Sequence, residues 1–354
     1  MSEQGQKLDI EITGTGHKLG VHWWGNSELG NDADVEWLVV VVHGVKRRML
    51  EPAALRPTPR DLSAGSESQL QAATWRIYAP EFAHASRDAQ PLSSLADLLW
   101  SKSRDKRENT NANSHFVWTR AGVYADGSAP DNSRDPALTG HVLMDVLLTT
   151  LVRKHPNAKH VRLVGFSAGA QFFQRYCALS KTLDSLRSEW KTLRVFLGTA
   201  SSWLYLDHHR LNHSTISVDT ITNGNIPLEF LPLPGGHKDP LNKYKFGLYA
   251  IPNPLNPSND SIDTIRARLL SYKTTFILVD DDIHFGPSLD VSSPALAQCQ
   301  FHRYARSLVY LHYLSSYFPD SFASNINTVA VTNCGHDGAK VYAQTAVHAV
   351  IWGL

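Results

Sequence analysis

The stretch from Val161 to Gln171, VRLVGFSAGAQ, restricts the fold of this chain more than any other. An apolar run, a Gly-x-Ser-x-Gly motif and the start of a helical pattern follow one another there. This order predicts a strand, a tight turn and a helix, the nucleophile elbow that lifts Ser167 out of a sheet. Glycine is needed on both sides because the turn strains the serine backbone and larger neighbours would clash. The alternative, a surface serine in a glycine turn, fits poorly with so apolar a strand.

Apolar strands alternate with helical patterns along most of the chain, which predicts a mostly parallel sheet with helices on both faces. Residues 7–25 alternate between polar and apolar and contain four glycines, a pattern that predicts a β-hairpin. The Val-rich run Val35–Val42 predicts a strand buried on both faces. Further strands are expected at 74–79, 161–165, 193–199, 274–279 and 326–331, and helices at 93–100, 137–154, 168–187, 294–317 and 338–352.

Composition narrows the class of protein. The 354 residues are 42% hydrophobic and 19% charged, which suits one large domain over residues 1–354. A net charge of +1 argues against nucleic acid or an anionic membrane as a partner. The run Trp37–Val42 is too short to span a bilayer, and residues 1–10 contain no apolar signal-peptide core. With three widely spaced cysteines and no sign of a disulfide framework, a cytoplasmic location is expected.

Residues 203–262 interrupt the alternation of strands and helices. They are rich in Pro, Asn and aromatic residues and show little periodicity. An irregular segment of this length inside a domain is usually a lid or a binding element. Its position between two sheet strands predicts a cap over Ser167. The alternative is a surface excursion without a catalytic role.

A serine nucleophile needs a histidine to take its proton and a carboxylate to orient that histidine. In folds with a nucleophile elbow, the three catalytic residues follow one another along the chain as Ser, acid and His, and each lies on a loop after a strand. The strand at 274–279 leads into Asp280-Asp281-Asp282, and the strand at 326–331 is followed by Cys334-Gly-His-Asp-Gly338. His336 is therefore the candidate base.

Three consecutive aspartates repel one another, so the cluster calls for an explanation. Asp282 lies furthest into the loop, where it could turn towards His336, and is the preferred acid. Asp280 and Asp281 remain alternatives. A divalent metal held by the three carboxylates with His284 is conceivable, but no second ligand cluster supports it, so we expect no metal and no cofactor.

The oxyanion of a tetrahedral intermediate needs two backbone N–H donors. One is expected from Ala168, just after the nucleophile, and the other from Val45, after the strand that ends at His43-Gly44. The alternative is that Gly44 is an ordinary turn glycine and that His43 is a histidine of the core. Trp203, Tyr205 and Phe166 are candidates for the substrate pocket, although core packing explains Trp203 and Tyr205 equally well.

With the elbow, the His-Gly strand end and the late Gly-His-Asp in that order, the chain resembles the α/β-hydrolase superfamily from about Val35 to its C-terminus. It looks closest to a little-characterised group of bacterial and fungal members. Two departures from the common superfamily pattern are Phe166, where a His often precedes the nucleophile, and Ala170, where a second Gly is frequent. The stretches that carry the closer resemblance are His43-Gly-Val-Lys-Arg47, Ala79-Pro-Glu-Phe82, Ser167-Ala-Gly-Ala-Gln171, Gln174-Arg-Tyr176, Ala297-Gln-Cys-Gln300 with Arg303 and Arg306, and Gly335-His-Asp337.

The resemblance implies an α/β-hydrolase fold with a mostly parallel central sheet flanked by helices and a cap insertion. It implies Ser167 as nucleophile, His336 as base and Asp282 as acid, and it implies no substrate. We expect hydrolysis of a carboxylic ester of a small organic substrate, with cleavage of an amide bond as a further option. A lyase, cyclase or acyltransferase on the same fold, or a non-catalytic binding protein, is the alternative.

Overall fold

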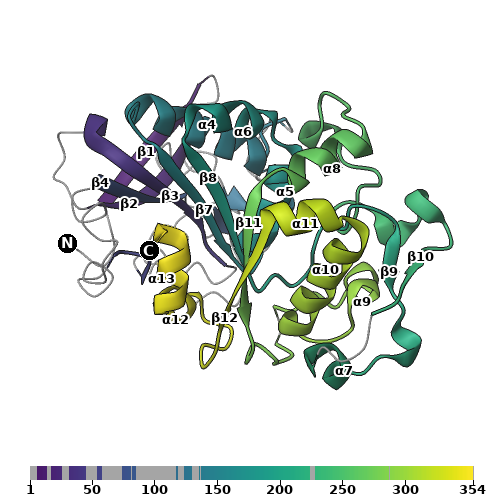
Figure 1. The fold of residues 1–354 in the computed structure, drawn as a ribbon. Helices are drawn as coiled ribbons and strands as arrows, with labels where there is room; N and C mark the ends of the chain where they lie inside the picture. The colour runs from purple at the N-terminus through teal and green to yellow at the C-terminus, as the bar shows by residue number, and fades with distance from the viewer. Residues whose placement is uncertain are drawn as a thin grey trace, which may run out of the picture.

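An eight-stranded, mostly parallel sheet forms the centre of the molecule (Figure 1). In spatial order its strands are β1 (Gln6–Ile12), β2 (His17–Gly25), β4 (Thr74–Pro80), β3 (Val35–Val42), β7 (His160–Phe166), β8 (Thr192–Gly198), β11 (Lys273–Val279) and β12 (Ile326–Val331). The strand β2 pairs antiparallel with both β1 and β4, and every pair from β4 onwards is parallel. The predicted hairpin and the predicted parallel sheet are both confirmed.

The computed structural model describes residues 6–13, 17–25, 32–44, 54–57, 74–80, 82–84, 117–118, 123–129, 135, 137–223, 228–286 and 288–353. The predicted helix at 93–100 and the candidate oxyanion donor Val45 lie outside these residues. Within them, no helix combines the length and the apolar character that crossing a membrane requires.

Two hydrophobic layers hold helices against opposite faces of the sheet. Along β3, Leu38, Val40 and Val42 point into one layer, whereas Val39 and Val41 point into the other. All five side chains are almost fully buried, as the Val-rich run predicted. The first layer contains α4 (Gly140–Lys154), α5 (Ala168–Leu179), α8 (Ile262–Leu270) and α10 (Arg303–Tyr317), and the second contains α12 (Gly338–Tyr342) and α13 (Thr345–Trp352).

Three long predicted helices are each divided in two, which corrects the sequence-based expectation. The predicted helix 168–187 breaks at Ser180, whose extended backbone ends α5 and whose hydroxyl caps α6 (Lys181–Leu186) by accepting from the Leu183 N–H at 2.9 Å. The predicted helix 294–317 breaks after α9 (Ser293–Gln298), and His302 caps α10. A short break separates α12 from α13. The apolar periodicity continues across these breaks, so it does not reveal them.

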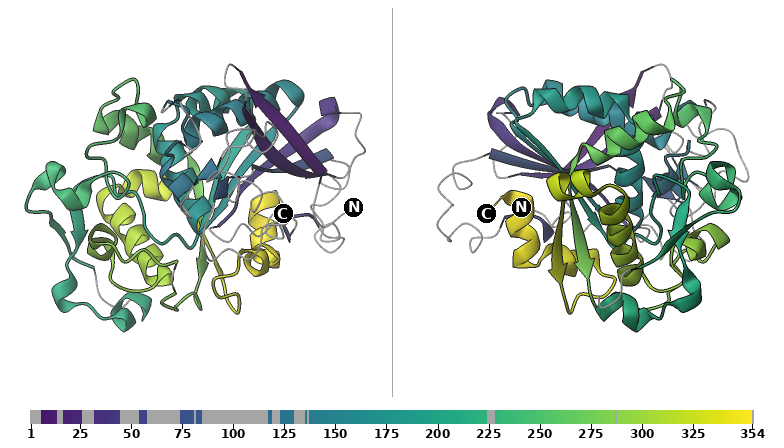
Figure 2. Two further views of the ribbon diagram at one scale, coloured as in Figure 1. Left: turned by 180° about the vertical axis from the view of Figure 1, so that it is seen from behind. Right: turned by 45° about the vertical axis from the view of Figure 1, so that its right-hand side comes forward.

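The segment 203–262 lies beside α10, on the flank of the molecule away from α12 and α13 (Figures 1 and 2). It contains a two-stranded sheet of β9 (His209–Leu211) and β10 (Phe230–Pro232), the short helix α7 (Val218–Asn223) and several 3-10 turns. The Tyr317 hydroxyl of α10 donates to the Phe230 carbonyl at 3.4 Å. Farther along, the Lys245 ammonium lies 3.2 Å from Asp126 and 3.9 Å from Asp290. That this segment caps Ser167 stays a prediction.

Candidate active site

Ser167 occupies the turn between β7 and α5, with φ 56° and ψ −114°. A β-carbon added to Gly169 would overlap the Val42 carbonyl, and one added to Gly165 would overlap the Gly169 carbonyl. The two glycines therefore allow the first turn of α5 to approach β3 and β7 closely. Since a positive φ is costly for a serine, the surrounding packing must hold this conformation. The strand, turn and helix predicted from the motif are all present.

His336 lies between Ser167 and Asp282. Its Nε2 is 3.0 Å from Ser167 Oγ, and its Nδ1 is 2.7 Å from Asp282 Oδ2. The aspartate is 1% exposed and Ser167 4% exposed, whereas the His336 side chain is 24% exposed. A hydrogen-bonded chain thus runs from a buried carboxylate through an accessible imidazole to the serine hydroxyl.

The three consecutive aspartates have three different environments. Asp282 faces His336 with one oxygen, and its other oxygen lies 3.8 Å from the buried Arg303 guanidinium. Asp281 accepts hydrogen bonds from the backbone N–H groups of Gly335 at 2.9 Å and Cys334 at 3.3 Å. Asp280 is exposed, and its N–H donates to the Val331 carbonyl at 3.2 Å. In the described part of the chain, no group of His, Cys, Asp and Glu side chains is arranged to hold a metal ion.

Arg303 lies beside the Asp282 oxygen that does not contact His336. Its side chain is almost fully buried, and its Nη2 donates to the Ser288 hydroxyl at 2.9 Å. Burial lowers the pKa of Arg303, and the charge of Asp282 opposes that shift. Arginine retains its proton under ordinary conditions, so its positive charge beside the Asp282 side chain helps to hold that side chain in place.

Thr199 is a residue of the site that the sequence analysis does not single out. It follows β8, has a φ of 45°, and is 1% exposed. Its hydroxyl lies 3.5 Å from His336 Nδ1, the atom that also contacts Asp282. A positive φ is rare for a β-branched residue and costs about 1–3 kcal/mol. No motif in the sequence marks this position, because the strain arises from the packing around the site.

One of the two predicted oxyanion donors can be located. Ala168 is the first residue of α5, where backbone N–H groups have no partner within the helix. Beside it lies Gly44, at which an added β-carbon would be 3.5 Å from Ser167 Cβ. The preceding His43 carbonyl accepts from the Tyr124 hydroxyl at 2.6 Å. The strand end His43-Gly44 therefore lies beside the nucleophile, and the oxyanion donors Ala168 and Val45 stay a prediction.

The three predicted pocket residues are all buried. Phe166 lies beneath the base, with its ring centroid 5.0 Å from that of His336. Trp203 stacks on Tyr310 at 5.2 Å, and Tyr205 packs against the same ring. Trp203 and Tyr205 are each 1% exposed, the position that the core-packing alternative describes, and their contact with a substrate stays a prediction.

Buried polar side chains hold the segment that follows Thr199. Gln171, one turn into α5, donates to the Ser201 hydroxyl at 3.0 Å and accepts from Ser202 at 2.9 Å. Gln298 accepts from the Trp203 N–H at 2.9 Å and donates to its carbonyl at 2.6 Å. Gln171 and Gln298 both belong to the stretches that carry the closer family resemblance. Their observed contacts are structural, since they satisfy the backbone and hydroxyl groups of a buried segment.

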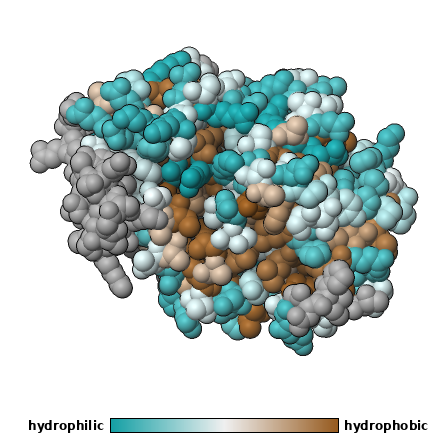
Figure 3. Space-filling view, in the orientation of Figure 1, coloured by the Kyte–Doolittle hydropathy of each residue, from teal (hydrophilic) through white to brown (hydrophobic). Residues whose placement is uncertain are grey.

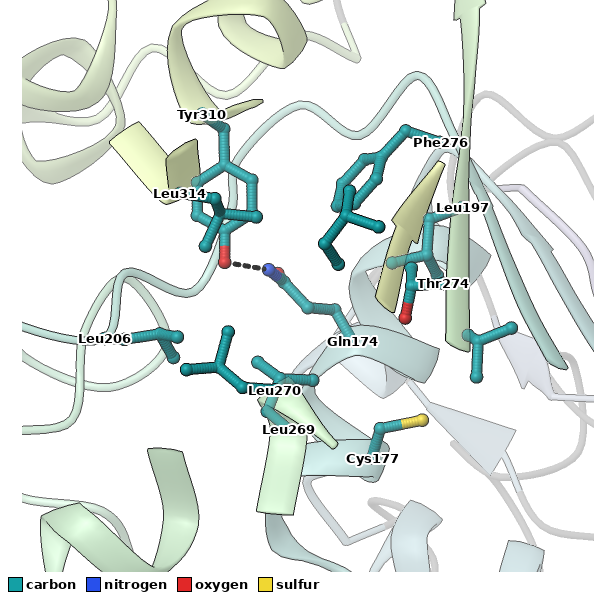
Figure 4. Close-up of a pocket in the computed structure, with 12 residues that line it drawn as sticks. Gln174, Cys177, Leu197, Leu206, Leu269, Leu270, Thr274, Phe276, Tyr310 and Leu314 are labelled. Atoms are coloured by element: carbon teal, nitrogen blue, oxygen red, sulfur yellow. Dashed lines mark hydrogen bonds between the residues drawn. The ribbon is translucent and has the colours of Figure 1, made fainter. Parts of the chain in front are cut away.

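A separate small cavity lies within the core on the α5 and α10 side of the sheet (Figure 4). Its lining is mostly apolar and includes Cys177, Leu206 and Leu314. The one hydrogen bond drawn in it joins the Gln174 amide to the Tyr310 hydroxyl at 2.8 Å. Because Ser167, His336 and Asp282 do not line it, this cavity is a packing feature and not the candidate site.

No model of a known protein family matches the chain, and no curated protein matches it either. Among solved structures, LpqC, a poly(3-hydroxybutyrate) depolymerase from Bordetella parapertussis, is similar with a TM-score of 0.57 and 17% identity, over 99% of this chain and 90% of that chain. Poly(aspartic acid) hydrolase-1 from Sphingomonas sp. KT-1 is similar with a TM-score of 0.54 and 15% identity, over 99% of both chains. At these identities the likeness concerns the fold. The strand order, the elbow and these similarities agree that the chain has the α/β-hydrolase fold predicted from its motifs.

Proposed function

We propose that this protein is a serine hydrolase that cleaves a carboxylic ester of a small organic substrate. The observation that carries the proposal is the contact chain from Ser167 Oγ to His336 Nε2 at 3.0 Å and from His336 Nδ1 to Asp282 Oδ2 at 2.7 Å. Both distances are those of hydrogen bonds, and the serine stands at a strained elbow. Core packing alone does not account for such a chain at the carboxyl ends of three parallel strands.

In the proposed reaction Ser167 Oγ attacks the ester carbonyl carbon while His336 Nε2 takes the hydroxyl proton. The N–H groups of Ala168 and Val45 stabilise the negative oxygen of the tetrahedral intermediate. The carbon–oxygen bond to the alcohol then breaks, and His336 returns the proton to the departing alcohol. A water molecule, deprotonated by His336, then attacks the acyl-enzyme; the bond between the acyl carbon and Ser167 Oγ breaks, and His336 returns the proton to Oγ, which releases the acid and free Ser167.

Asp282 is proposed to hold the imidazole in the tautomer with a proton on Nδ1. That tautomer leaves the Nε2 lone pair facing the serine hydroxyl. The Arg303 guanidinium, 3.8 Å from the other Asp282 oxygen, keeps the carboxylate from turning away. Asp282 is 1% exposed, so water does not compete for its contact with His336.

The two similar structures are named a poly(3-hydroxybutyrate) depolymerase and a poly(aspartic acid) hydrolase. These names favour hydrolysis as the reaction class and leave ester and amide cleavage to experiment. The proposal includes a small-molecule substrate, no nucleic-acid or membrane partner, and a cytoplasmic location.

The test is turnover of p-nitrophenyl esters, from acetate to long acyl chains, by wild type and Ser167→Ala. Ser185→Ala, at an exposed serine of α6, is the matched control. We expect Ser167→Ala alone to lose hydrolysis and labelling by a serine-reactive phosphonate. Labelling of Ser167 without ester turnover would favour a lyase, cyclase or acyltransferase. Absence of labelling would favour a non-catalytic binding protein.

A further inference from the structure

Exposed apolar side chains are concentrated just after the proposed triad acid. Five large hydrophobic residues of the described chain are exposed, and four of them lie between positions 283 and 296. Ile283 is 47% exposed, Phe285 67%, Val291 64% and Leu296 36%. The fifth, Leu231 at 46%, lies in β10. We call residues 280–286 and 288–292 the acid loop.

The first part of the acid loop lies close to His336. Consecutive Cα atoms are about 3.8 Å apart, so the Cα of Phe285 lies within about 11 Å of the Cα of Asp282. Asp282 itself contacts His336 Nδ1 at 2.7 Å. In Figure 3 apolar residues gather across the centre and lower part of the face, where β11 and β12 end in Figure 1. Ile283 and Phe285 thus present apolar surface one and three residues along the chain from the carboxylate that contacts the imidazole.

The far end of the acid loop returns towards the nucleophile. One nitrogen of Arg306, Nη1, donates both to the Asp290 carbonyl, at 2.7 Å, and to the Ser201 carbonyl. The Ser201 hydroxyl accepts from Gln171, whose own N–H donates to the Ser167 carbonyl at 3.2 Å. Asp290, directly before Val291, is therefore linked to the first turn of α5 through the side chains of Arg306, Ser201 and Gln171.

Specific contacts hold the acid loop in this conformation. The buried Arg303 donates to the Ser288 hydroxyl at 2.9 Å, and Leu289 is 5% exposed. Next to it, the Asp290 carboxylate lies 3.9 Å from Lys245 of the 203–262 segment. In this conformation Phe285 and Val291 leave apolar surface in water, which is unfavourable unless a ligand covers it.

We propose that Ile283, Phe285 and Val291 form the binding surface for an apolar group of the substrate, an alkyl or aryl chain on one side of the scissile carbonyl. This inference rests on the proposed function, because it deepens the substrate class of the same site. Because the loop is joined to the base at Asp282 and to Ser201 through Arg306 and Asp290, either the acyl or the alcohol part of an ester can carry this group. In both cases the group that binds is an apolar chain several carbons long.

The test compares Phe285→Ser and Val291→Ser with Leu231→Ser, the same kind of change at an exposed apolar residue in β10. Two substrate series are used: p-nitrophenyl esters from acetate to decanoate, and acetates of alcohols from ethanol to octanol. In one series, we expect wild-type kcat/KM to rise with chain length. Phe285→Ser and Val291→Ser should lose about tenfold on the long members, through KM, and keep the activity on the short ones. Leu231→Ser should match wild type.

A binding measurement separates this inference from the proposed reaction. Calorimetry with Ser167→Ala gives Kd for intact p-nitrophenyl octanoate and acetate, with and without Phe285→Ser. Tighter binding of octanoate that Phe285→Ser removes supports the apolar surface even if wild type turns over no ester. Equal loss on short and long esters, or no loss in either loop variant, would overturn it. So would activity that appears only above the critical micelle concentration and depends on Phe285, because that result indicates docking to a lipid surface.

Discussion

The carboxylate of Asp281 accepts a hydrogen bond from the backbone N–H of Gly335 at 2.9 Å, joining the loops that follow β11 and β12. The neighbouring Cys334 N–H donates to the same carboxylate at 3.3 Å. Gly335 has a φ of 55° and directly precedes His336. Two adjacent aspartates thus have different contacts: Asp282 bonds the imidazole, and Asp281 bonds the backbone that bears it.

Replacing Asp281 tests whether it positions His336. Asp281→Ala removes both acceptor contacts, so we expect kcat on a reactive ester to fall about tenfold as the His336 loop loosens. Asp281→Asn keeps one acceptor oxygen and should recover most of the rate. The measurement is kcat and KM for both variants beside their melting temperatures. Equal activity losses in the two variants, in proportion to lost stability, would indicate a structural role only.

Asp282→Asn tests the acid assignment. An asparagine at this position can favour the wrong imidazole tautomer, which in other triads lowers kcat by about 10⁴ while the geometry is retained. We expect a loss of that order with an unchanged circular dichroism spectrum. Should Asp281→Asn remove the activity and Asp282→Asn leave it intact, the assignment of Asp282 as the acid is wrong.

Gly169→Ala tests the close packing at the elbow. The added methyl group would overlap the Val42 carbonyl, and backbone cannot move aside as a flexible side chain can. We expect the free energy of unfolding to fall by at least about 2 kcal/mol, with loss of hydrolysis. Gly286→Ala is the control, since an added β-carbon there has no neighbour within 4 Å, and its stability should change by less than about 0.5 kcal/mol. Denaturant unfolding of both variants measures the two free energies. Similar stabilities of Gly169→Ala and Gly286→Ala would refute the predicted overlap at Gly169.

The buried His141 makes the stability of the protein depend on pH. Its imidazole is packed against Phe172 and Tyr176, and burial, aided by the nearby Arg175 charge, lowers the pKa of His141 from 6.5 to about 3. The unfolded chain therefore binds a proton between these two pKa values, and the folded chain does not. This contribution to stability is fully present above pH 6.5 and is lost as the pH falls towards 3.

Between pH 7 and pH 5 the His141 contribution amounts to about 2 kcal/mol. We expect the free energy of unfolding of wild type to decrease over that interval. His141→Phe, which has no proton to bind, should lack this part of the slope. Urea titrations at several pH values measure the slopes, and parallel curves for the two proteins would contradict the assignment.

Local sequence signals predicted the parts of the fold that depend on neighbours along the chain. The elbow at Ser167 follows from an apolar strand, two glycines and a helical pattern, and the overlap at Gly169 shows the steric reason for the motif. The alternation of residues 7–25 predicted a hairpin whose register pairs Leu8 with Val21. The breaks at Ser180 and His302 were not predicted, because an uninterrupted apolar periodicity continues through both.

By itself, the sequence determined the sheet, the elbow and the two strand ends that carry Asp282 and His336, because periodicity and glycine sterics act over a few residues. Only the tertiary structure decided which aspartate faces His336, where Thr199 lies, and that Trp203 is buried in the core. Those outcomes depend on the strand order of the parallel sheet, which places the carboxyl ends of β7, β8, β11 and β12 side by side from distant parts of the chain. Contacts of that kind leave no local pattern, so they are read only from the folded chain.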